Sequence, residues 1–216
     1  MLVRGKPHGS NLARSVCIGL DNLAEGEDEV EEDPFVATAM SAAEEVLAPP
    51  LSIQRGASLL YQVTVDNHLQ IRVDPKKPMR GQSAFQTDLC VFETLDAETK
   101  IPRVVLEFKP GLSTHDVLIY SAKARKHKQI YPYLRYGLVI GNEAKVPGKF
   151  FTHNEALDFC VASASYKSNR LHEIIARLLK SEVQASRQLE KVAFGSTPVH
   201  VYRSDVVLDE GTGKVV

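Results

Sequence analysis

Two apolar segments joined by a mainly polar loop constrain the fold of this chain more than any other feature. Residues 87–93 and 103–109 are rich in β-branched and aromatic side chains, and nine residues separate them. This pattern predicts the two strands of one β-hairpin. Three ionisable residues, Asp88, Glu107 and Lys109, interrupt segments that otherwise have the composition of core strands. The same hairpin is therefore the first place to look for a functional site.

The alternation of side chains along the second segment puts the two charged residues on one face. Residues two apart in a strand point the same way, so Glu107 and Lys109 share a face with Val105. A carboxylate and an ammonium on a half-buried strand face are unfavourable unless they bind something. Asp88 lies near the start of the partner strand, and two neighbouring carboxylates repel each other unless a divalent cation lies between them. Lys109 is placed to contact a water or a phosphate beside that cation. The opposite face carries Val104, Leu106 and Phe108.

A helix and a third strand are predicted after the hairpin. Pro110 and Gly111 end the second strand, and Ser113 or Thr114 caps a helix that ends near Pro132. A strand at 136–141 follows. Strand, strand, helix, strand is the order expected of a mixed sheet with a crossover connection. Helical spacing assigns one stripe of this helix to His115, Ile119, Ala122, Lys126, Gln129 and Tyr133.

The remaining elements complete an α/β fold with a central mixed sheet, flanking helices and a long C-terminal helix. A helix is predicted from Asp33 and Pro34 to the Pro49–Pro50 stop, with strands at 58–65 and 68–73. A short helix is predicted at 154–163 and a last strand at 199–208. The long amphipathic helix begins at Ser168–Asn169 and carries Leu171, Ile174, Ile175, Leu178, Leu179, Val183, Leu189 and Val192 as its apolar stripe.

Length and charge give the domain organisation. The 216 residues predict one domain with additional segments. Residues 1–33 form an acidic flexible arm, residues 34–142 the core, and residues 143–216 a helical extension with a C-terminal strand in the same domain. Residues 1–34 hold three basic and eight acidic side chains, whereas residues 100–149 hold ten basic and three. A basic middle in a chain of net charge −1 suits a face that meets phosphates, and a solvated helix face is the simpler interpretation.

Composition excludes several other classes of protein. No apolar run is long enough for a transmembrane helix, and the N-terminus has no secretory signal, so no membrane partner is expected. Three widely spaced cysteines argue for a reducing, cytoplasmic setting and against a disulfide framework or a structural zinc site. The chain has no Gly-rich phosphate loop of either standard type and no H-E-x-x-H motif.

The pattern of Asp88, then Glu107-Phe108-Lys109, resembles the catalytic core of the PD-(D/E)xK nuclease superfamily, whose members have a restriction-endonuclease-like fold. The resemblance covers residues 35–142, about half of the chain. The chain departs from the pattern at Thr87, where many members have proline. Gln129 and Tyr133 match the Q-x-x-x-Y motif of the RecB-like and lambda-exonuclease-like branches.

The resemblance implies a metal site and the roles of its residues. Mg²⁺, with Mn²⁺ as a substitute, is bound by Asp88, Glu107 and the backbone carbonyl of Phe108, and a helical glutamate, Glu44 or Glu45, completes the site. Lys109 orients or deprotonates the attacking water, and Gln129 contacts that water or a phosphate. The candidate nucleic-acid contacts are Tyr133, Lys126, Lys123 and Arg80.

The function expected on this resemblance is Mg²⁺-dependent hydrolysis of DNA phosphodiester bonds by an endonuclease. Two alternatives stay open: a RecB-type exonuclease, and a nuclease-like fold that binds nucleic acid or protein without cleaving it. A homodimer through the long C-terminal helix is the alternative to its packing on the sheet. The sequence does not indicate a recognition site, or distinguish DNA from RNA.

Overall fold

The structure is a computed structural model that describes residues 29–81, 83–196 and 198–201. Most of the predicted acidic arm and of the predicted last strand therefore lie outside the described residues. The described elements are α1 (Glu29–Val46), β1 (Leu51–Arg55), β2 (Ser58–Leu60), β3 (Ala84–Gln86), β4 (Leu89–Thr94), β5 (Lys100–Lys109), α2 (Thr114–Ile130), β6 (Arg135–Ile140), α3 (Gly148–His153), β7 (Phe159–Ala162) and α4 (Ser168–Phe194).

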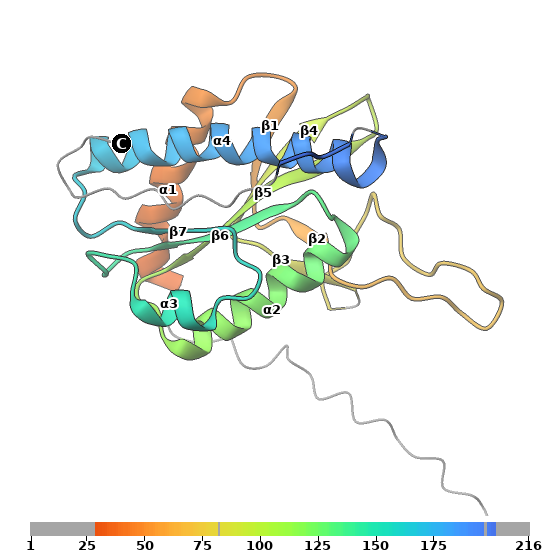
Figure 1. Cartoon of the computed structure of the whole chain (residues 1–216), viewed down its shortest axis with the longest axis horizontal. Helices are drawn as coiled ribbons and strands as arrows, with labels where there is room; N and C mark the ends of the chain where they lie inside the picture. Colours follow the sequence, from red (N-terminus) through yellow and green to blue (C-terminus); the bar gives the residue numbers. More distant parts are fainter. Residues whose placement is uncertain (1–28, 82, 197, 202–216) are drawn as a thin grey trace, which may run out of the picture.

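A mixed five-stranded sheet of order β1-β4-β5-β6-β7 forms the centre of the molecule (Figure 1). The predicted hairpin is confirmed: β4 pairs antiparallel with β5, and β1 continues the antiparallel half. On the other side of β5, β6 and β7 run parallel. The prediction of an α/β fold with a central mixed sheet, flanking helices and a long C-terminal helix is therefore confirmed.

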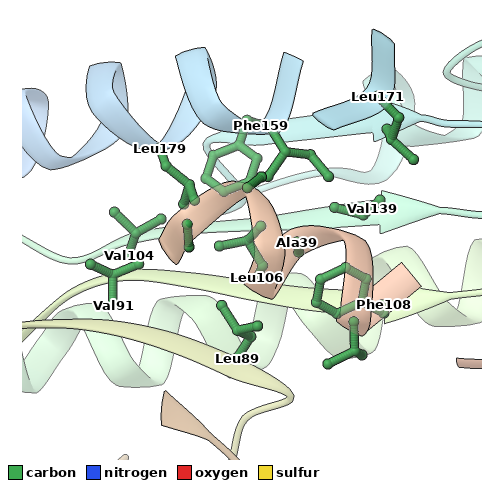
Figure 2. Close-up of a cluster of buried hydrophobic side chains, with 14 of the residues drawn as sticks. Ala39, Leu89, Val91, Val104, Leu106, Phe108, Val139, Phe159, Leu171 and Leu179 are labelled. Atoms are coloured by element: carbon green, nitrogen blue, oxygen red, sulfur yellow. The ribbon is translucent and has the colours of Figure 1, made fainter. Parts of the chain in front are cut away.

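The two faces of the sheet bury different side chains, as the alternation along β5 predicts. On one face α1 and α4 pack over Val104, Leu106 and Phe108, and Figure 2 shows this all-apolar layer. On the other face Val105 packs beneath α2 and α3. Glu107 lies on this second face, where it contacts Tyr136 of β6.

The first strand predictions were largely wrong. The chain leaves the ribbon formed by β2 and β3 after Leu60, so the predicted strand at 58–65 keeps only its first three residues. The predicted strand at 68–73 is reduced to a single bridge between Val65 and Ile71. These residues have strand composition, but beyond the Tyr61 amide, which donates to the Ser83 carbonyl at 2.9 Å, their described ladder is the short pairing around Val65 and Ile71.

Two further boundaries differ from the predictions. Residues 29–33 already belong to α1, because glutamate is a good helix former and suits the N-terminal turns of a helix. The segment predicted as a helix at 154–163 contains β7, which pairs with the edge of β6. A short apolar run is compatible with either a helix or a strand. This segment is a strand because it pairs with the edge of β6.

Helix α2 begins where predicted and buries a different stripe. The Ser113 hydroxyl accepts from the Asp116 amide at 3.1 Å, and the Asp116 carboxylate accepts from the Ser113 amide at 2.7 Å, which completes a capping box. The predicted stripe is wrong: His115 and Gln129 are exposed, and Tyr133 lies beyond the helix. The buried residues of α2 are Val117, Tyr120, Ser121, Ala124 and His127.

Helix α4 confirms most of its predicted stripe. Leu171, Ile175, Leu179 and Val183 are buried against the sheet, while Val192 is half-exposed at the end of the helix. Within the described ranges, no helix is both long and apolar enough to cross a membrane.

We expect Gly137→Ala to destabilise the fold. Gly137 of β6 lies opposite Phe159 of β7, and a Cβ at this position would overlap the Phe159 ring. Overpacking of this kind lowers the free energy of unfolding by about 1–3 kcal/mol. Urea unfolding measures the loss. Gly148→Ala is the matched control, because nothing lies within 4 Å of its added Cβ. Equal stability of the two variants would contradict the packing described here.

Candidate functional site

The β4–β5 hairpin brings two carboxylates together at the point where the strands separate. The last paired residues are Leu89 and Leu106, so Asp88 lies just outside the ladder, beside Glu107. The Phe108 amide donates to Asp88 Oδ2 at 2.8 Å. The Asp88 amide donates to Glu107 Oε2 at 3.4 Å. The structure therefore places the predicted pair side by side and ties both residues to the backbone.

Glu107 is the buried member of the pair. Its side chain is only 2% exposed, and it accepts a short hydrogen bond from the Tyr136 hydroxyl. Burial and, to a smaller extent, the neighbouring Asp88 charge together raise the pKa of Glu107 to about 8. The Lys123 ammonium and the Tyr136 hydroxyl offset only part of this. The site thus disfavours a second negative charge unless a cation enters it.

A second buried glutamate, at the other end of the same hairpin, shows how the fold stabilises a buried carboxylate with partners of its own. Glu93 accepts from Arg103 Nε and Arg187 Nη2, both at 2.6 Å. Burial raises the pKa of Glu93, but hydrogen bonds from Arg187 and Arg103 outweigh that effect and the pKa is lowered. Glu93 is thus neutralised by two guanidinium groups of the protein. Glu107 instead accepts from the Tyr136 hydroxyl and the Asp88 amide, and the Lys123 charge does not outweigh its burial.

Helix α2 lines the side of the site above Glu107. The Ser113 capping box sets where the helix begins, and this directs Lys123 and Tyr120 toward the carboxylate face. The Lys123 ammonium lies 5.0 Å from the centre of the Tyr120 ring, and its charge favours ionised Glu107. Lys126, one turn further, lies over Tyr61 at 5.2 Å. Both lysines therefore belong to the same side of the molecule as Glu107.

His127 supports the site from behind. Its ring is fully buried, stacks on Tyr136 at 5.7 Å and has Nδ1 2.9 Å from the Leu60 carbonyl. Burial lowers the pKa of His127 to about 4, so the ring is neutral at physiological pH. A neutral ring bonded to this carbonyl carries its proton on Nδ1. His127 therefore holds the β2–β3 ribbon and the Tyr136 ring in place beside Glu107.

The donors at this site fit a hard divalent cation. The amide and carbonyl of one strand residue point to the same neighbouring strand. The Lys109 carbonyl accepts from Gly141 on the β6 side, and the Phe108 amide points to Asp88 on the other side. The Phe108 carbonyl therefore faces Asp88. Two carboxylates and a carbonyl are oxygen ligands of the kind Mg²⁺ prefers. Among the described residues, no group of three or more His, Cys, Asp and Glu side chains forms.

The structure does not bring the candidate helical glutamates to this site. Glu44 and Glu45 are exposed on α1, which covers the opposite face of the sheet. Glu45 instead lies 3.3 Å from His172 Nε2 of α4. Lys109 is partly buried and lies two residues beyond Glu107 on β5.

The Q-x-x-x-Y residues also lie away from the carboxylates. Gln129 is exposed near the end of α2. Tyr133 is buried two residues before β6, with its ring centre 5.4 Å from the Arg103 guanidinium carbon and 6.1 Å from the Phe194 ring. Arg103 precedes Glu107 by four strand residues, or about 13 Å. Burial raises the pKa of Tyr133 to about 12, as expected of a core aromatic.

Sequence reasoning did not assign a role at the site to Tyr136 or His127. The register of β6 supplies the missing signal, because Leu138 lies opposite Glu107 and Tyr136 shares its face two residues earlier. His127 falls on the stripe of α2 that the predicted periodicity missed. Arg80, a candidate nucleic-acid contact, donates to Gln86 Oε1 at 2.9 Å beside the β2–β3 ribbon.

No protein-family model matches the chain, and a search of curated proteins finds no match.

The free energy of unfolding should fall as the pH rises, because of Glu107. With divalent ions removed, folded Glu107 keeps its proton up to about pH 8, whereas the unfolded chain loses it near the ordinary value of 4.5. Folding therefore binds a proton between these values, so stability falls across this window and levels off above it. Each unit of pKa difference corresponds to about 1.4 kcal/mol. Urea unfolding at about pH 5 and about pH 8 measures the slope.

Glu107→Gln is the variant that isolates this effect, because its amide oxygen still accepts from Tyr136. We expect the variant to lose the slope and to be more stable than the wild type at about pH 8. Glu98→Gln, which changes an exposed loop carboxylate, should retain the wild-type slope. A wild-type slope in Glu107→Gln would contradict the burial and crowding described for this carboxyl.

Proposed function

We propose that this chain is a Mg²⁺-dependent DNA endonuclease of the PD-(D/E)xK superfamily. The observation that carries the proposal is the pair of Asp88 and Glu107 carboxylates, which the hairpin holds side by side and ties to backbone amides. The fold stabilises buried Glu93 with two arginines, yet it leaves Glu107 crowded by Asp88. A divalent cation would relieve that repulsion.

In this proposal each residue has a defined task. Asp88, Glu107 and the Phe108 carbonyl would hold Mg²⁺, which supplies an activated water and stabilises charge on the scissile phosphate. Tyr136 orients the Glu107 carboxylate by donating to it. Lys109, on the same strand face as Glu107, orients the water or steadies the phosphate. Lys123, which approaches from α2, adds positive charge where negative charge develops.

The surroundings of the carboxylates supply cations for a nucleic-acid backbone. Three cations lie on this side of the molecule: Lys123 and Lys126 of α2, and Arg80 beside the β2–β3 ribbon. Lys123 lies over the Tyr120 ring, Lys126 lies over the Tyr61 ring, and Arg80 donates to Gln86. Positive side chains gathered around a carboxylate site favour a polyanionic substrate. The proposal therefore keeps these three residues as phosphate contacts and assigns no such role to Tyr133.

A non-cleaving nucleic-acid-binding module is the second candidate. The observation that favours it is the hydrogen bond from Tyr136 to a Glu107 that is 2% exposed, since a protonated buried carboxyl can have a purely structural role. The RecB-type alternative has no comparable support, because Gln129 and Tyr133 do not meet the carboxylates.

A cleavage assay with purified protein tests the proposal. We expect Mg²⁺ to support cutting of circular and linear DNA and EDTA to abolish it. Asp88→Asn, Glu107→Gln and Lys109→Ala should each lower the rate about 100-fold or more. Mg²⁺ should also raise the Tm of the wild type and not that of Glu107→Gln, because a ligand of the folded state stabilises it.

Glu98→Gln is the control, since it removes an exposed carboxylate from the loop of the same hairpin. It should cut like the wild type. DNA binding without cleavage, unchanged in Glu107→Gln and with no Mg²⁺-dependent shift in Tm, would favour the non-cleaving module. Degradation only from DNA ends would replace the endonuclease by an exonuclease.

A further inference from the structure

Residues 61–81 leave the β2–β3 ribbon and return to it without joining the main sheet. We call this segment the arm; it is distinct from the acidic arm predicted for residues 1–33. In Figure 1 the arm projects from the body of the fold beside β2 and β3. Its outer part is a small hairpin: the Asp66 amide donates to the Gln70 carbonyl at 3.0 Å, and the Arg72 amide donates to the Thr64 carbonyl at 3.0 Å. The single bridge between Val65 and Ile71 lies between these bonds.

The tip of the arm is ordered by its own hydrogen bonds. Asp66 Oδ1 accepts from the His68 amide at 2.8 Å and from the Gln70 amide at 2.9 Å. The Asp66 carboxylate also pairs with the Arg72 guanidinium. These contacts close the turn around one protruding residue, Leu69.

Leu69 is unfavourable for folding in two respects. Its side chain is 87% exposed, and its φ of 61° places it in the left-handed region. Asparagine and glycine adopt that conformation more readily than leucine does. A strained backbone that presents an exposed apolar side chain gains nothing from the folded chain itself. Such a position indicates a residue that acts on a partner.

The rest of the arm combines apolar and basic side chains. Val65 is 55% exposed and Ile71 64% exposed, and as a cross-strand pair they share one face of the hairpin. Four cations and two carboxylates lie in residues 61–81, so the arm is positively charged overall. The cations are Arg72, Lys76, Lys77 and Arg80. An apolar tip flanked by cations matches a nucleic-acid groove, where phosphates border stacked apolar bases.

We propose that the arm docks onto duplex DNA, with Leu69 inserted at a base step and the arm's cations on the flanking phosphates. The inference rests on the proposed function for the identity of its partner. The base of the arm is joined to the site, because Tyr61 stacks on Phe85 at 3.9 Å and carries the Lys126 ammonium over its ring. Phe85 precedes Asp88 by three residues. The arm therefore extends the basic side of the site along the duplex.

Leu69→Asn tests the proposal without endangering the fold, since asparagine favours the same backbone conformation. We expect this variant to have an equal or higher Tm and to bind a fluorescent duplex about tenfold more weakly, with EDTA present to prevent cleavage. The loss should be similar at low and high salt, because Leu69 carries no charge. End-labelled DNA should also be bent less by Leu69→Asn than by the wild type.

Leu95→Asn is the matched control, because Leu95 is 55% exposed on the β4–β5 loop and outside the arm. It should bind and bend DNA like the wild type. Equal DNA affinity of Leu69→Asn and the wild type would overturn the role of Leu69 and leave the nuclease proposal standing if the wild type cleaves. Leu69-dependent binding without cleavage would support the arm and overturn the nuclease. If Leu69→Asn only converts a dimer into a monomer, the arm contacts a second copy of the chain and the proposal fails.

Discussion

The side-by-side placement of Asp88 and Glu107 is the constraint on which the rest of the site depends. One carboxylate beside a second, buried one is unfavourable in a medium that solvates charge poorly. The fold accepts this arrangement because three separate elements support it. The hairpin supplies backbone amides to Asp88 and Glu107, β6 supplies the Tyr136 hydroxyl, and α2 supplies the charge of Lys123. These contacts do not fully offset the burial of Glu107 and its repulsion by Asp88, so the pKa of Glu107 stays raised. This remaining cost of the ionised carboxylate is what makes the pair a candidate cation site.

Each end of the β4–β5 hairpin buries a glutamate, but the two glutamates have different partners. At one end, Glu93 and Arg103 are buried together, and Glu190 of α4 lies 2.6 Å from Arg103 Nη2. That cluster joins the sheet to the C-terminal helix and leaves Glu93 fully neutralised. At the other end, Glu107 faces away from α4, toward α2. Tyr133 packs on Arg103 at the Glu93 end of the hairpin.

The molecule also separates a well-packed body from a projecting arm. Both faces of the five-stranded sheet are covered by helices, and Val104, Val105, Leu106 and Phe108 of β5 are completely buried. Large apolar residues at the tip of the arm are exposed instead, and they are held out by hydrogen bonds of the turn around Asp66. Ordered exposure of this kind differs from the isolated surface leucines that most proteins carry. The arm is attached to the ribbon that leads to Asp88, so the arm and the carboxylates face a common partner in the proposed function.

The sequence by itself determined the elements whose signals are local. Alternation along 103–109 placed Glu107 opposite the apolar face, a cap at Ser113 or Thr114 marked the start of α2, and the spacing of Leu171, Ile175 and Leu179 defined α4. Only the tertiary structure decided which neighbours those residues meet. The buried stripe of α2 depends on the sheet beneath it, β7 exists because β6 offers an edge, and Tyr133 packs on Arg103 instead of beside Glu107. Helical or strand spacing specifies which residues share a face, and the packing of one element on another specifies what that face contacts.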